Sequence, residues 1–207
     1  MNAHEIERWM IESVETRSEL HESPFVHAHL RDFLPPDVYT ELTQNWPDTG
    51  WQELVHPDQL KPDGTYRRRQ LRVLDAWPEL GIALEGPALL DAFSRVLRRP
   101  VQRAFPQALL LDDEAGYWIR PHPDTRNKQI TVQVYLPDTD AHPEMGTWMM
   151  GRAQPDSRFV EYRPNTGFAF PVTQNSNHEV KAGACTAPRR SLQVLYYDSE
   201  RPNIRYK

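Results

Sequence analysis

The sequence has a single cysteine, Cys185, among 207 residues. One thiol forms no internal disulfide, and it cannot supply the thiolate sets of structural zinc or iron–sulfur sites. No apolar run approaches the ~18 residues that a membrane-spanning helix requires. The opening segment, Met1–Met10, is polar and acidic, unlike the positively charged start and apolar stretch of a signal peptide. We therefore expect a soluble, cytoplasmic protein without membrane contact.

Positive charge is also in short supply. The chain has 24 Lys and Arg against 29 Asp and Glu, a net charge of −5, which argues against nucleic acid as a partner. The hydrophobic fraction of 39% is too high for a disordered chain, and 207 residues suffice for one domain with a proper core. Glycine is scarce, with 9 residues, whereas proline is abundant, with 19. Many prolines favour a fold of short strands and turns over a helical bundle.

The hydrophobic pattern divides the chain into a helical or mixed part, about 1–105, and a β part, about 106–198. In the first part, helices are predicted around Ile6–Arg17, at Asp37–Asn45 and after Gly86–Pro87, with strands at Phe25–Leu34 and Tyr66–Asp75. In the second part, the predicted strands are Gln107–Leu111, Tyr117–Arg120, Gln129–Leu136, Thr147–Met150, Arg158–Tyr162, Gly167–Phe170, His178–Ala182 and Ser191–Tyr197. Strands that follow one another without intervening helices predict a sandwich, a barrel or a jelly roll.

Two of these strands have one apolar face and one largely polar face. In the strand 129–136, Thr131, Gln133 and Tyr135 alternate with β-branched and aliphatic residues, and the strand 189–197 behaves similarly. One interpretation is an antiparallel pair whose polar face lies in water, which is common. The other is a barrel whose apolar face packs on helices and whose polar face lines a pocket. The strands alone leave both open.

A His-x-Asp pair, His122 and Asp124, is the first candidate for a metal site. Residues i and i+2 of an extended chain project to the same side, so both side chains can hold one ion. Similar tripeptides begin at His56 and at His142, but both lie in polar turns that contain proline. The pair at His122 instead follows the strand-like run Tyr117–Arg120 and precedes a strong strand. We therefore assign the metal site to this pair.

The third ligand is predicted to be His178, which heads a later strand after a turn. Two imidazoles and one carboxylate form the facial triad of non-haem Fe(II) oxygenases, which leaves coordination positions open. Arg189 and Ser191 then share one face of the last strand. A guanidinium binds a carboxylate through two hydrogen bonds, and a neighbouring hydroxyl can add another. This ordered set arises by chance far less often than any one of its members.

With these residues in place, the sequence resembles the Fe(II)/2-oxoglutarate-dependent dioxygenases, in particular their small prolyl-hydroxylase-like branch. The resemblance covers about Phe25–Tyr197. It is carried by Gly116-Tyr117-Trp118-Ile119-Arg120-Pro121 with His122-Pro123-Asp124, by Lys128-Gln129-Ile130-Thr131 and Tyr135-Leu136, by Gly146-Thr147, Pro164-Asn165-Thr166-Gly167 and Phe170, and by His178-Glu179-Val180 with Arg189-x-Ser191. It implies one domain over 1–207 with a mainly β fold. That fold is a double-stranded β-helix, or cupin-like jelly roll, with helices packed on one sheet.

The same resemblance implies an oxidoreductase that uses Fe(II), with 2-oxoglutarate and O₂ as co-substrates. His122, Asp124 and His178 would bind the iron, and Arg189 and Ser191 would hold the distal carboxylate of 2-oxoglutarate. The reaction would release succinate and CO₂ and would hydroxylate the substrate. Related halogenases have Gly or Ala in place of the metal carboxylate, so the Asp in this chain favours hydroxylation.

Further residues are predicted to line the pocket. Gln133, Thr131 and Tyr135 are expected to contact the co-substrate or to support its ligands. Trp118 and Arg120 share strand parity with the first iron ligand, so both are candidates for contact with the substrate. For Trp118 the favoured alternative is a place in the core, and for Arg120 the choice is between a clamp for an anionic group and a structural ion pair. The neighbouring Arg190 is an alternative anchor for 2-oxoglutarate, although strand alternation favours Arg189.

Two segments complete the sequence predictions. The cluster Arg67–Arg72 is interpreted as a solvated strand edge, with the alternative that it recruits an acidic substrate or carrier protein. The loop Trp46–Gly64 is a candidate lid. The expected function is hydroxylation of a small molecule, such as an amino acid or a natural-product intermediate. The alternatives are a peptide or protein hydroxylase of the same chemistry, and a cupin-like metal- or sugar-binding jelly roll without oxygenase activity. The oligomeric state is left open.

Overall fold

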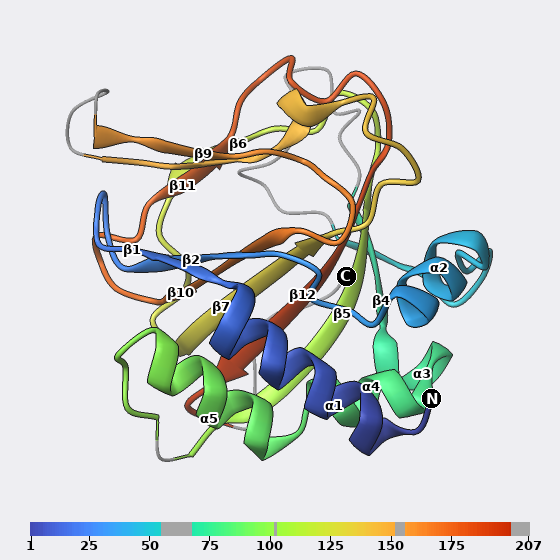
Figure 1. The fold of residues 1–207 in the computed structure, drawn as a ribbon. Coiled ribbons are helices and arrows are strands. Elements are labelled where there is room, and N and C mark those ends of the chain that lie inside the picture. Colours follow the sequence, from blue (N-terminus) through green and yellow to red (C-terminus); the bar gives the residue numbers. More distant parts are fainter. Residues whose placement is uncertain (55–67, 102, 152–155, 200–207) are drawn as a thin grey trace.

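The computed structural model describes residues 1–207 except 55–67, 102, 152–155 and 200–207. Two antiparallel β-sheets lie face to face, and helices cover the outer face of the larger sheet (Figure 1). Within the described residues, the larger sheet has eight strands in the order β1-β2-β10-β7-β12-β5-β4-β3, and the smaller has four in the order β6-β11-β8-β9. This is the double-stranded β-helix expected from the sequence. No helix in the described part of the chain is long and apolar enough to cross a bilayer.

The element bounds are as follows. The strands of the larger sheet are β1 (Glu19–His21), β2 (His27–Leu30), β3 (Gln52–Leu54), β4 (Arg68–Arg72), β5 (Phe105–Asp113), β7 (Lys128–Tyr135), β10 (Gly167–Pro171) and β12 (Arg189–Tyr197). Those of the smaller sheet are β6 (Ile119–His122), β8 (Thr147–Met149), β9 (Arg158–Val160) and β11 (His178–Val180). The α-helices are α1 (Ala3–Glu12), α2 (Pro36–Gln44), α3 (Val73–Ala76), α4 (Pro78–Leu84) and α5 (Pro87–Val96).

The helices account for part of the proline excess. Helices α2, α4 and α5 each begin at a proline, a position where the missing N–H and the fixed φ of proline cost nothing. Helix α1 begins instead with a capping box, in which the Asn2 side chain accepts from the Glu5 amide at 3.0 Å and the Glu5 carboxylate accepts from the Asn2 amide at 2.9 Å. Ile6 and Met10 on the inner side of this helix are buried.

The apolar faces of β7 and β12 pack beneath these helices. Val132 lies opposite Val194, and Val134 lies opposite Leu192. All four side chains are fully buried, and they belong to the same core cluster as Phe93 and its neighbours on α5. The apolar face of these two strands therefore packs on helices, as one of the two interpretations of the sequence expected.

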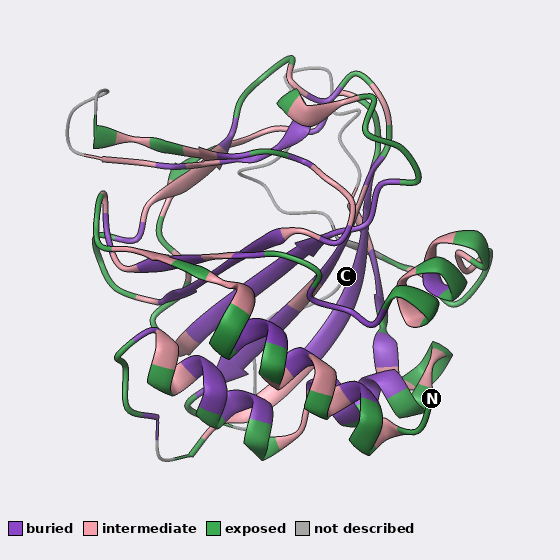
Figure 2. Ribbon diagram, viewed as in Figure 1, coloured by how far each residue is buried: buried purple, intermediate pink, exposed green. Residues whose placement is uncertain are grey.

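The polar faces of the same strands lie on the side away from the helices, and most of their residues are buried as well; Figure 2 colours most of β7 and β12 as buried. Thr131 is 1% exposed, Gln133 is 8% exposed, and Tyr135 and Ser191 have no exposed surface. The sequence left open whether this face lies in water or lines the interior. Their burial shows that this polar face lines the interior, because polar side chains on a solvated face would keep most of their surface exposed.

The N-terminal part contributes more to the sheet than the sequence predicted. Strands β1, β2, β3 and β4 all belong to the larger sheet, and the chain after β4 forms α3 rather than a continued strand. The interpretation of Arg67–Arg72 as a solvated strand edge is wrong for the described residues, because β4 lies between β3 and β5. Arg69 pairs with Asp112, and Arg72 pairs with Glu85. Arg67 and most of the predicted lid, 55–64, lie outside the described residues.

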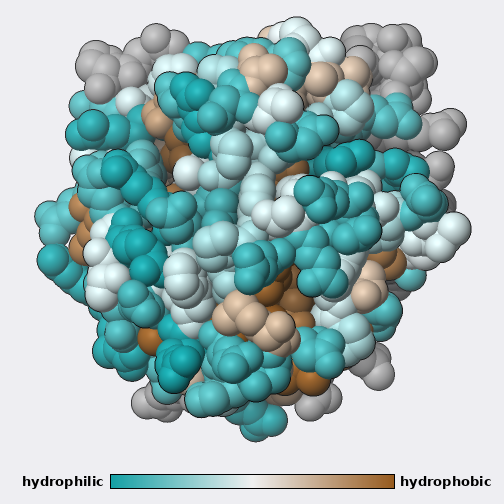
Figure 3. All heavy atoms as spheres, turned by 45° about the vertical axis from the view of Figure 1, so that its right-hand side comes forward, coloured by the Kyte–Doolittle hydropathy of each residue, from teal (hydrophilic) through white to brown (hydrophobic). Residues whose placement is uncertain are grey.

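The face of the molecule shown in Figure 3 is mostly hydrophilic, with apolar spots scattered over it. In the described part of the chain, Met1 and Ile82 are the large hydrophobic side chains with the most exposure, at 56% and 57%. Isolated exposed hydrophobic residues are normal for a folded domain.

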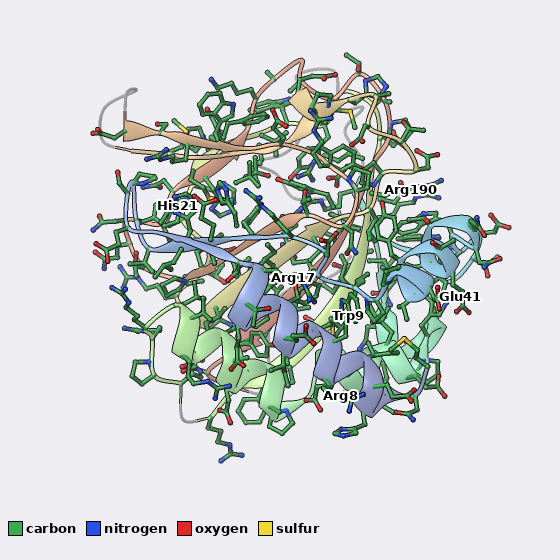
Figure 4. The ribbon with its side chains drawn as sticks, in the orientation of Figure 1. Arg8, Trp9, Arg17, His21, Glu41 and Arg190 are labelled. Carbon is green, nitrogen blue, oxygen red and sulfur yellow. The ribbon has the colours of Figure 1, made fainter. Side chains whose placement is uncertain are left out.

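Three histidines gather at one end of the larger sheet, where Figure 4 labels His21. His21 of β1 lies opposite His27 of β2, with ring centres 5.1 Å apart, and His29 lies 4.4 Å from His21 and 5.2 Å from His27. Burial lowers the pKa of His27 to about 4 and that of His29 to about 3. The folded protein therefore keeps both rings neutral at pH values where an unfolded chain would protonate them.

We expect stability to fall as the pH drops from about 6.5 toward 4. Below about pH 6.5 the unfolded chain takes up protons on His27 and His29, whereas the folded protein resists protonation. The free energy of unfolding therefore falls by roughly 1–3 kcal/mol per histidine. Urea unfolding at pH 7 and pH 5 measures this loss. The variant His29→Gln should show a smaller loss than the wild type, while His4→Gln on the exposed side of α1 should keep the full pH dependence. An equal pH dependence in all three proteins would contradict the assignment.

Candidate functional site

The pairing of β6 with β11 places two candidate ligands side by side. His122 ends β6, His178 begins β11, and the two residues lie opposite each other with ring centres 4.5 Å apart. An ion at about 2.1 Å from each Nε2 lies about 3.2 Å from each ring centre, so two imidazoles that share it at about 90° have centres about 4.5 Å apart. The spacing suits two ligands of one octahedral ion.

Backbone carbonyls orient both rings. The Nδ1 atoms of His122 and His178 lie 2.9 Å and 3.2 Å from the carbonyl oxygens of Arg120 and Ser176. This arrangement puts the proton on Nδ1 and leaves Nε2 as the ligand atom. Burial lowers the pKa of both imidazoles, that of His178 to about 4. Both rings are therefore neutral at physiological pH, as metal binding requires.

The carboxylate of Asp124 is held at both oxygens. Lys128 Nζ donates to Oδ1 at 2.5 Å, and the Thr131 hydroxyl donates to Oδ2 at 2.7 Å. Burial opposes ionisation of this carboxyl, but the neighbouring ammonium and His178, together with these hydrogen bonds, outweigh it and keep the pKa of Asp124 well below its usual range. Asp124 is therefore an anion fixed beside the two imidazoles.

The donor types fit Fe(II), although the side chains do not converge on one point. Among the residues that the structure describes, no three His, Cys, Asp or Glu side chains are arranged as around a bound ion. A carboxylate has about four lone-pair sites, so Asp124 can accept from Lys128 and Thr131 and still bind a metal. Two neutral imidazoles and one carboxylate are the ligand set of non-haem Fe(II) sites.

A column of polar side chains leads from Asp124 along the inner face of the larger sheet. We call Thr131, Gln133 and Tyr135 of β7 with Ser191 and Gln193 of β12 the inner polar column. Register places Gln133 opposite Gln193, and Tyr135 opposite Ser191. The amide of Gln133 donates to the Ser191 hydroxyl at 3.1 Å. Buried polar groups are tolerated where they satisfy one another, so this column is a polar interior rather than an apolar core.

Arg189 lies at the far end of the column and is fully buried. Its guanidinium donates to the Met145 carbonyl at 2.8 Å, to Asp113 Oδ2 at 3.1 Å and to the Thr147 hydroxyl at 3.1 Å. It also lies 5.1 Å from the ring centre of Tyr135. Burial disfavours its charge, but the pKa of Arg189 is nevertheless raised, because Tyr135 and Asp113 lie beside it.

Tyrosines surround the same guanidinium. Tyr135, Tyr162 and Tyr117 have their ring centres 5.1–5.9 Å from the Arg189 guanidinium carbon. Burial raises the pKa of each phenol, that of Tyr117 to about 12. The rings are therefore neutral, and they present polarised faces and hydroxyl groups to the cation.

The structure separates the two adjacent arginines of the last strand. Arg190 is only partly buried, and its guanidinium lies 5.0 Å from the ring of Trp46, away from the inner polar column. Figure 4 labels Arg190 at the right-hand edge of the molecule, above α2. Between the two candidates for a buried anion-binding residue, the geometry favours Arg189.

The strand parity that predicted Trp118 and Arg120 as substrate contacts is interrupted in the structure. Val180 pairs with Ile119 and His178 pairs with His122, so β6 has one more residue than β11 between the pairs. Such a bulge breaks the i, i+2 alternation. Arg120 is exposed, and a contact of either residue with substrate stays a prediction.

Sequence reasoning missed several residues around Arg189, above all Asp113 and Arg68. Asp113 is fully buried at the end of β5, after the apolar run 108–111. An acidic residue that continues an apolar strand was a usable signal, because a buried carboxylate requires a cation. Thr147 could not be assigned from the sequence, since its partner lies on a distant strand.

A cleft of about 630 Å³ opens close to the histidine pair. Its lining includes Pro121 and Asn177, the neighbours in sequence of His122 and His178. The remaining walls come from the β1–β2 turn and from the segments that follow β8 and β10, and these residues are Ser23, Pro24, Met150, Gly151, Asp156 and Asn175. Most of these side chains are uncharged.

The fold is shared with solved structures of known type. A prolyl-4-hydroxylase from Pseudomonas putida aligns with a TM-score of 0.64 and 15% identity, over 84% of this chain and 92% of that one. A 2OG-Fe(II) oxygenase family protein from Burkholderia pseudomallei aligns with a TM-score of 0.62 and 13% identity, over 86% and 88% of the two chains. The epimerase SnoN from nogalamycin biosynthesis aligns with a TM-score of 0.57 and 13% identity, over 95% and 80%.

These likenesses confirm the predicted architecture and the resemblance to the prolyl-hydroxylase-like branch at the level of fold. No family model matches the chain, and no curated protein matches it in sequence. At 13–15% identity the solved structures establish the double-stranded β-helix, while the chemistry has to be argued from the site.

Replacing Thr131 by Val should weaken binding of Co(II), a visible probe for Fe(II) sites, about tenfold, because Asp124 then loses the hydrogen bond that orients it. Titration followed by the visible absorption of Co(II) measures the affinity. The matched control is Thr147→Val, another buried threonine between the sheets, which does not touch Asp124. Equal losses in both variants, or none in Thr131→Val, would contradict this placement of Asp124.

Proposed function

We propose that the protein is an Fe(II)- and 2-oxoglutarate-dependent oxygenase that hydroxylates a small molecule and releases succinate and CO₂. The observation that carries the proposal is the inner polar column, with a His₂Asp donor set at one end and a buried arginine at the other. A 2-oxo acid with a second carboxylate matches this arrangement, since its 2-oxo acid end chelates a metal and its far end is an anion. The fold neighbours described above agree with this chemistry.

The metal end of the column supports the first half of the proposal. His122, Asp124 and His178 would hold Fe(II), with both imidazoles already neutral and the carboxylate already ionised. Thr131 and Lys128 would fix the carboxylate. Bound Fe(II) and 2-oxoglutarate would together supply the electrons that activate O₂, with succinate and CO₂ as the products of the co-substrate.

The arginine end supports the second half. Arg189 would bind the distal carboxylate, and Tyr135 lies beside it. The three nitrogens of Arg189 donate to Met145, Asp113 and Thr147 among the described residues, and a guanidinium has five N–H donors, so its two terminal nitrogens would also donate to a ligand carboxylate. Gln133 and Ser191, hydrogen-bonded to each other, lie between the two ends and would border the carbon chain of the co-substrate. Burial excludes water from this part of the site and strengthens each polar contact.

The cleft beside the histidine pair supports a small molecule as the substrate. Its volume of about 630 Å³ lies in the range of small-molecule sites. Among the structures with this fold, one prolyl hydroxylase from Trichoplax adhaerens is in complex with a peptide fragment, whereas SnoN is in complex with a nogalamycin compound. Peptide or protein hydroxylation is therefore the second candidate, and it rests on the neighbour with a peptide.

A metal- or sugar-binding jelly roll without oxygenase activity accounts less well for Arg189. Such a protein has no need for a fully buried cation at the far end of a polar column from the metal. Burying a guanidinium costs desolvation free energy, which only paired charges and hydrogen bonds offset. An anionic co-substrate explains the arrangement more simply.

The direct test is to add Fe(II) and 2-oxoglutarate to the apoprotein without oxygen. We expect a weak visible charge-transfer band, which His178→Ala abolishes. Arg189→Met should raise the dissociation constant for 2-oxoglutarate by about 10- to 100-fold, the worth of a charge-assisted bidentate contact. Thermal unfolding confirms that each variant is folded.

Arg190→Met is the matched control, because this neighbouring arginine lies against Trp46. It should keep the wild-type affinity for 2-oxoglutarate. If the wild type gives no band, the protein is not a 2-oxoglutarate oxygenase. If Arg190→Met and not Arg189→Met weakens binding, the co-substrate lies elsewhere in the fold.

A further inference from the structure

Three charged residues form a row across three neighbouring strands. Arg68 of β4 lies opposite Asp113 of β5, and Asp113 in turn lies opposite Arg189 of β12. Asp113 and Arg189 are fully buried, and the side chain of Arg68 is 11% exposed. The row crosses the strands, whereas the inner polar column follows β7 and β12, and the two meet at the arginine end.

Asp113 links the two cations. Its Oδ1 accepts from Arg68 Nε at 2.5 Å, and its Oδ2 accepts from another Arg68 nitrogen at 3.0 Å and from Arg189 at 3.1 Å. Arg68 is itself held, because it also donates to the Tyr117 hydroxyl at 2.7 Å and lies 4.5 Å from that ring. The carboxylate of Asp113 therefore has little freedom to move. The Arg189 nitrogen that donates to this carboxylate is restrained with it.

The remaining hydrogen bonds of Arg189 also restrain its guanidinium. The Met145 carbonyl accepts from Nε, and the Thr147 hydroxyl accepts from the third nitrogen. With Asp113, all three nitrogens of the guanidinium have a fixed partner. A planar group that is held at three atoms can neither rotate nor slide along its own axis.

The charge of Arg189 is only partly neutralised within the described residues. Asp113 is the one carboxylate there that forms an ion pair with it, and the single negative charge of Asp113 is shared with Arg68. The phenols beside Arg189 stay neutral, because burial raises their pKa. A second carboxylate at Arg189 would complete its neutralisation, so this guanidinium is suited to an anionic ligand.

We propose that Asp113 and Arg68 are positioning residues that fix the distance between the metal site and Arg189, and thereby select the chain length of the 2-oxo diacid. This inference rests on the proposed function. Asp113 acts through Arg189, and Arg68 acts through Asp113. A guanidinium at a fixed position binds the distal carboxylate of a five-carbon diacid, whereas a four- or six-carbon diacid places that carboxylate too near or too far.

The experiment compares four 2-oxo acids in the anaerobic Fe(II) titration. They are oxaloacetate, 2-oxoglutarate, 2-oxoadipate and pyruvate, which lacks a second carboxylate. The wild type should bind 2-oxoglutarate at least tenfold more tightly than the shorter and the longer diacid. In Asp113→Asn this preference should fall to about threefold or less, because the guanidinium can then follow the carboxylate. Pyruvate should bind equally to both proteins, since it does not reach Arg189.

Asp112→Asn is the matched control. Asp112 is the preceding residue of β5, is 7% exposed, and forms the equivalent ion pair with Arg69 on the opposite face of the strand. It should keep the full preference for 2-oxoglutarate. If Asp113→Asn is not stably folded, Arg68→Lys replaces it. This variant keeps the charge but loses the two-point grip on Asp113, and its preference should fall at least threefold.

The outcomes separate this inference from the proposed function. If wild type gives a band with 2-oxoglutarate and the Asp113 and Arg68 variants retain its tenfold preference, the two residues do not position Arg189 and the inference is overturned. An equal loss of preference in Asp112→Asn would also overturn it, because the effect would then be one of sheet stability. If wild type gives no band with any 2-oxo acid, the proposed function fails, and this inference fails with it.

Discussion

Asp113 carries one negative charge between two arginines, in the space between the sheets where water is largely excluded. Removing one partner of a buried ion pair leaves an uncompensated charge and costs roughly 3–5 kcal/mol, so the three residues constrain one another and the strands that carry them. The constraint reaches the site because Arg189 is at once a member of this row and the end of the inner polar column. The sheet order β12-β5-β4 is what allows one carboxylate to serve both cations. The tyrosines around Arg189 and the hydroxyl of Thr147 line the same region.

At the metal end of the inner polar column, both sheets contribute residues. The smaller sheet supplies the two imidazoles from the adjacent strands β6 and β11, whereas the larger sheet supplies Lys128 and Thr131, which hold Asp124. The candidate ligands are therefore set between the two sheets, and the stability of each sheet contributes to their placement. The pKa values of both histidines and of Asp124 are lowered, so all three side chains are deprotonated, but the causes differ. Burial removes protons from the imidazoles, and a nearby ammonium and hydrogen bonds keep the carboxylate ionised.

The sequence predicted the fold well where periodicity and local chemistry agree. All eight strands proposed after residue 106 exist, with bounds shifted by a few residues, and the three principal helices lie where apolar spacing and proline placed them. Alternation along 129–136 separated the helix-facing residues from the inner ones correctly. The candidate site residues His122, Asp124, His178 and Arg189 stay a prediction, and the structure places His122, His178 and Arg189 on β6, β11 and β12 and Asp124 just after β6.

The rest depended on contacts that have no local signature. The pairing of Arg68 with Asp113 joins residues 45 positions apart, and nothing near Arg68 distinguishes it from Arg69 or Arg72, which pair outside the site. Strand alternation is interrupted next to Arg120 by a bulge, and a bulge cannot be read from one strand because it depends on the partner strand, which tertiary structure selects. Strands β1 and β3 are three residues long, too short for alternation to be detected.

The central proposal is that one 2-oxo diacid spans the inner polar column from the metal ligands to Arg189. A crystal structure grown without oxygen, with Mn(II) in place of iron and with 2-oxoglutarate, measures this most directly. We predict a metal bound by His122, Asp124 and His178, and a distal carboxylate on Arg189, which keeps its hydrogen bond to Asp113. A diacid whose far carboxylate lies on another residue, or a metal that is bound without Asp124, would contradict it.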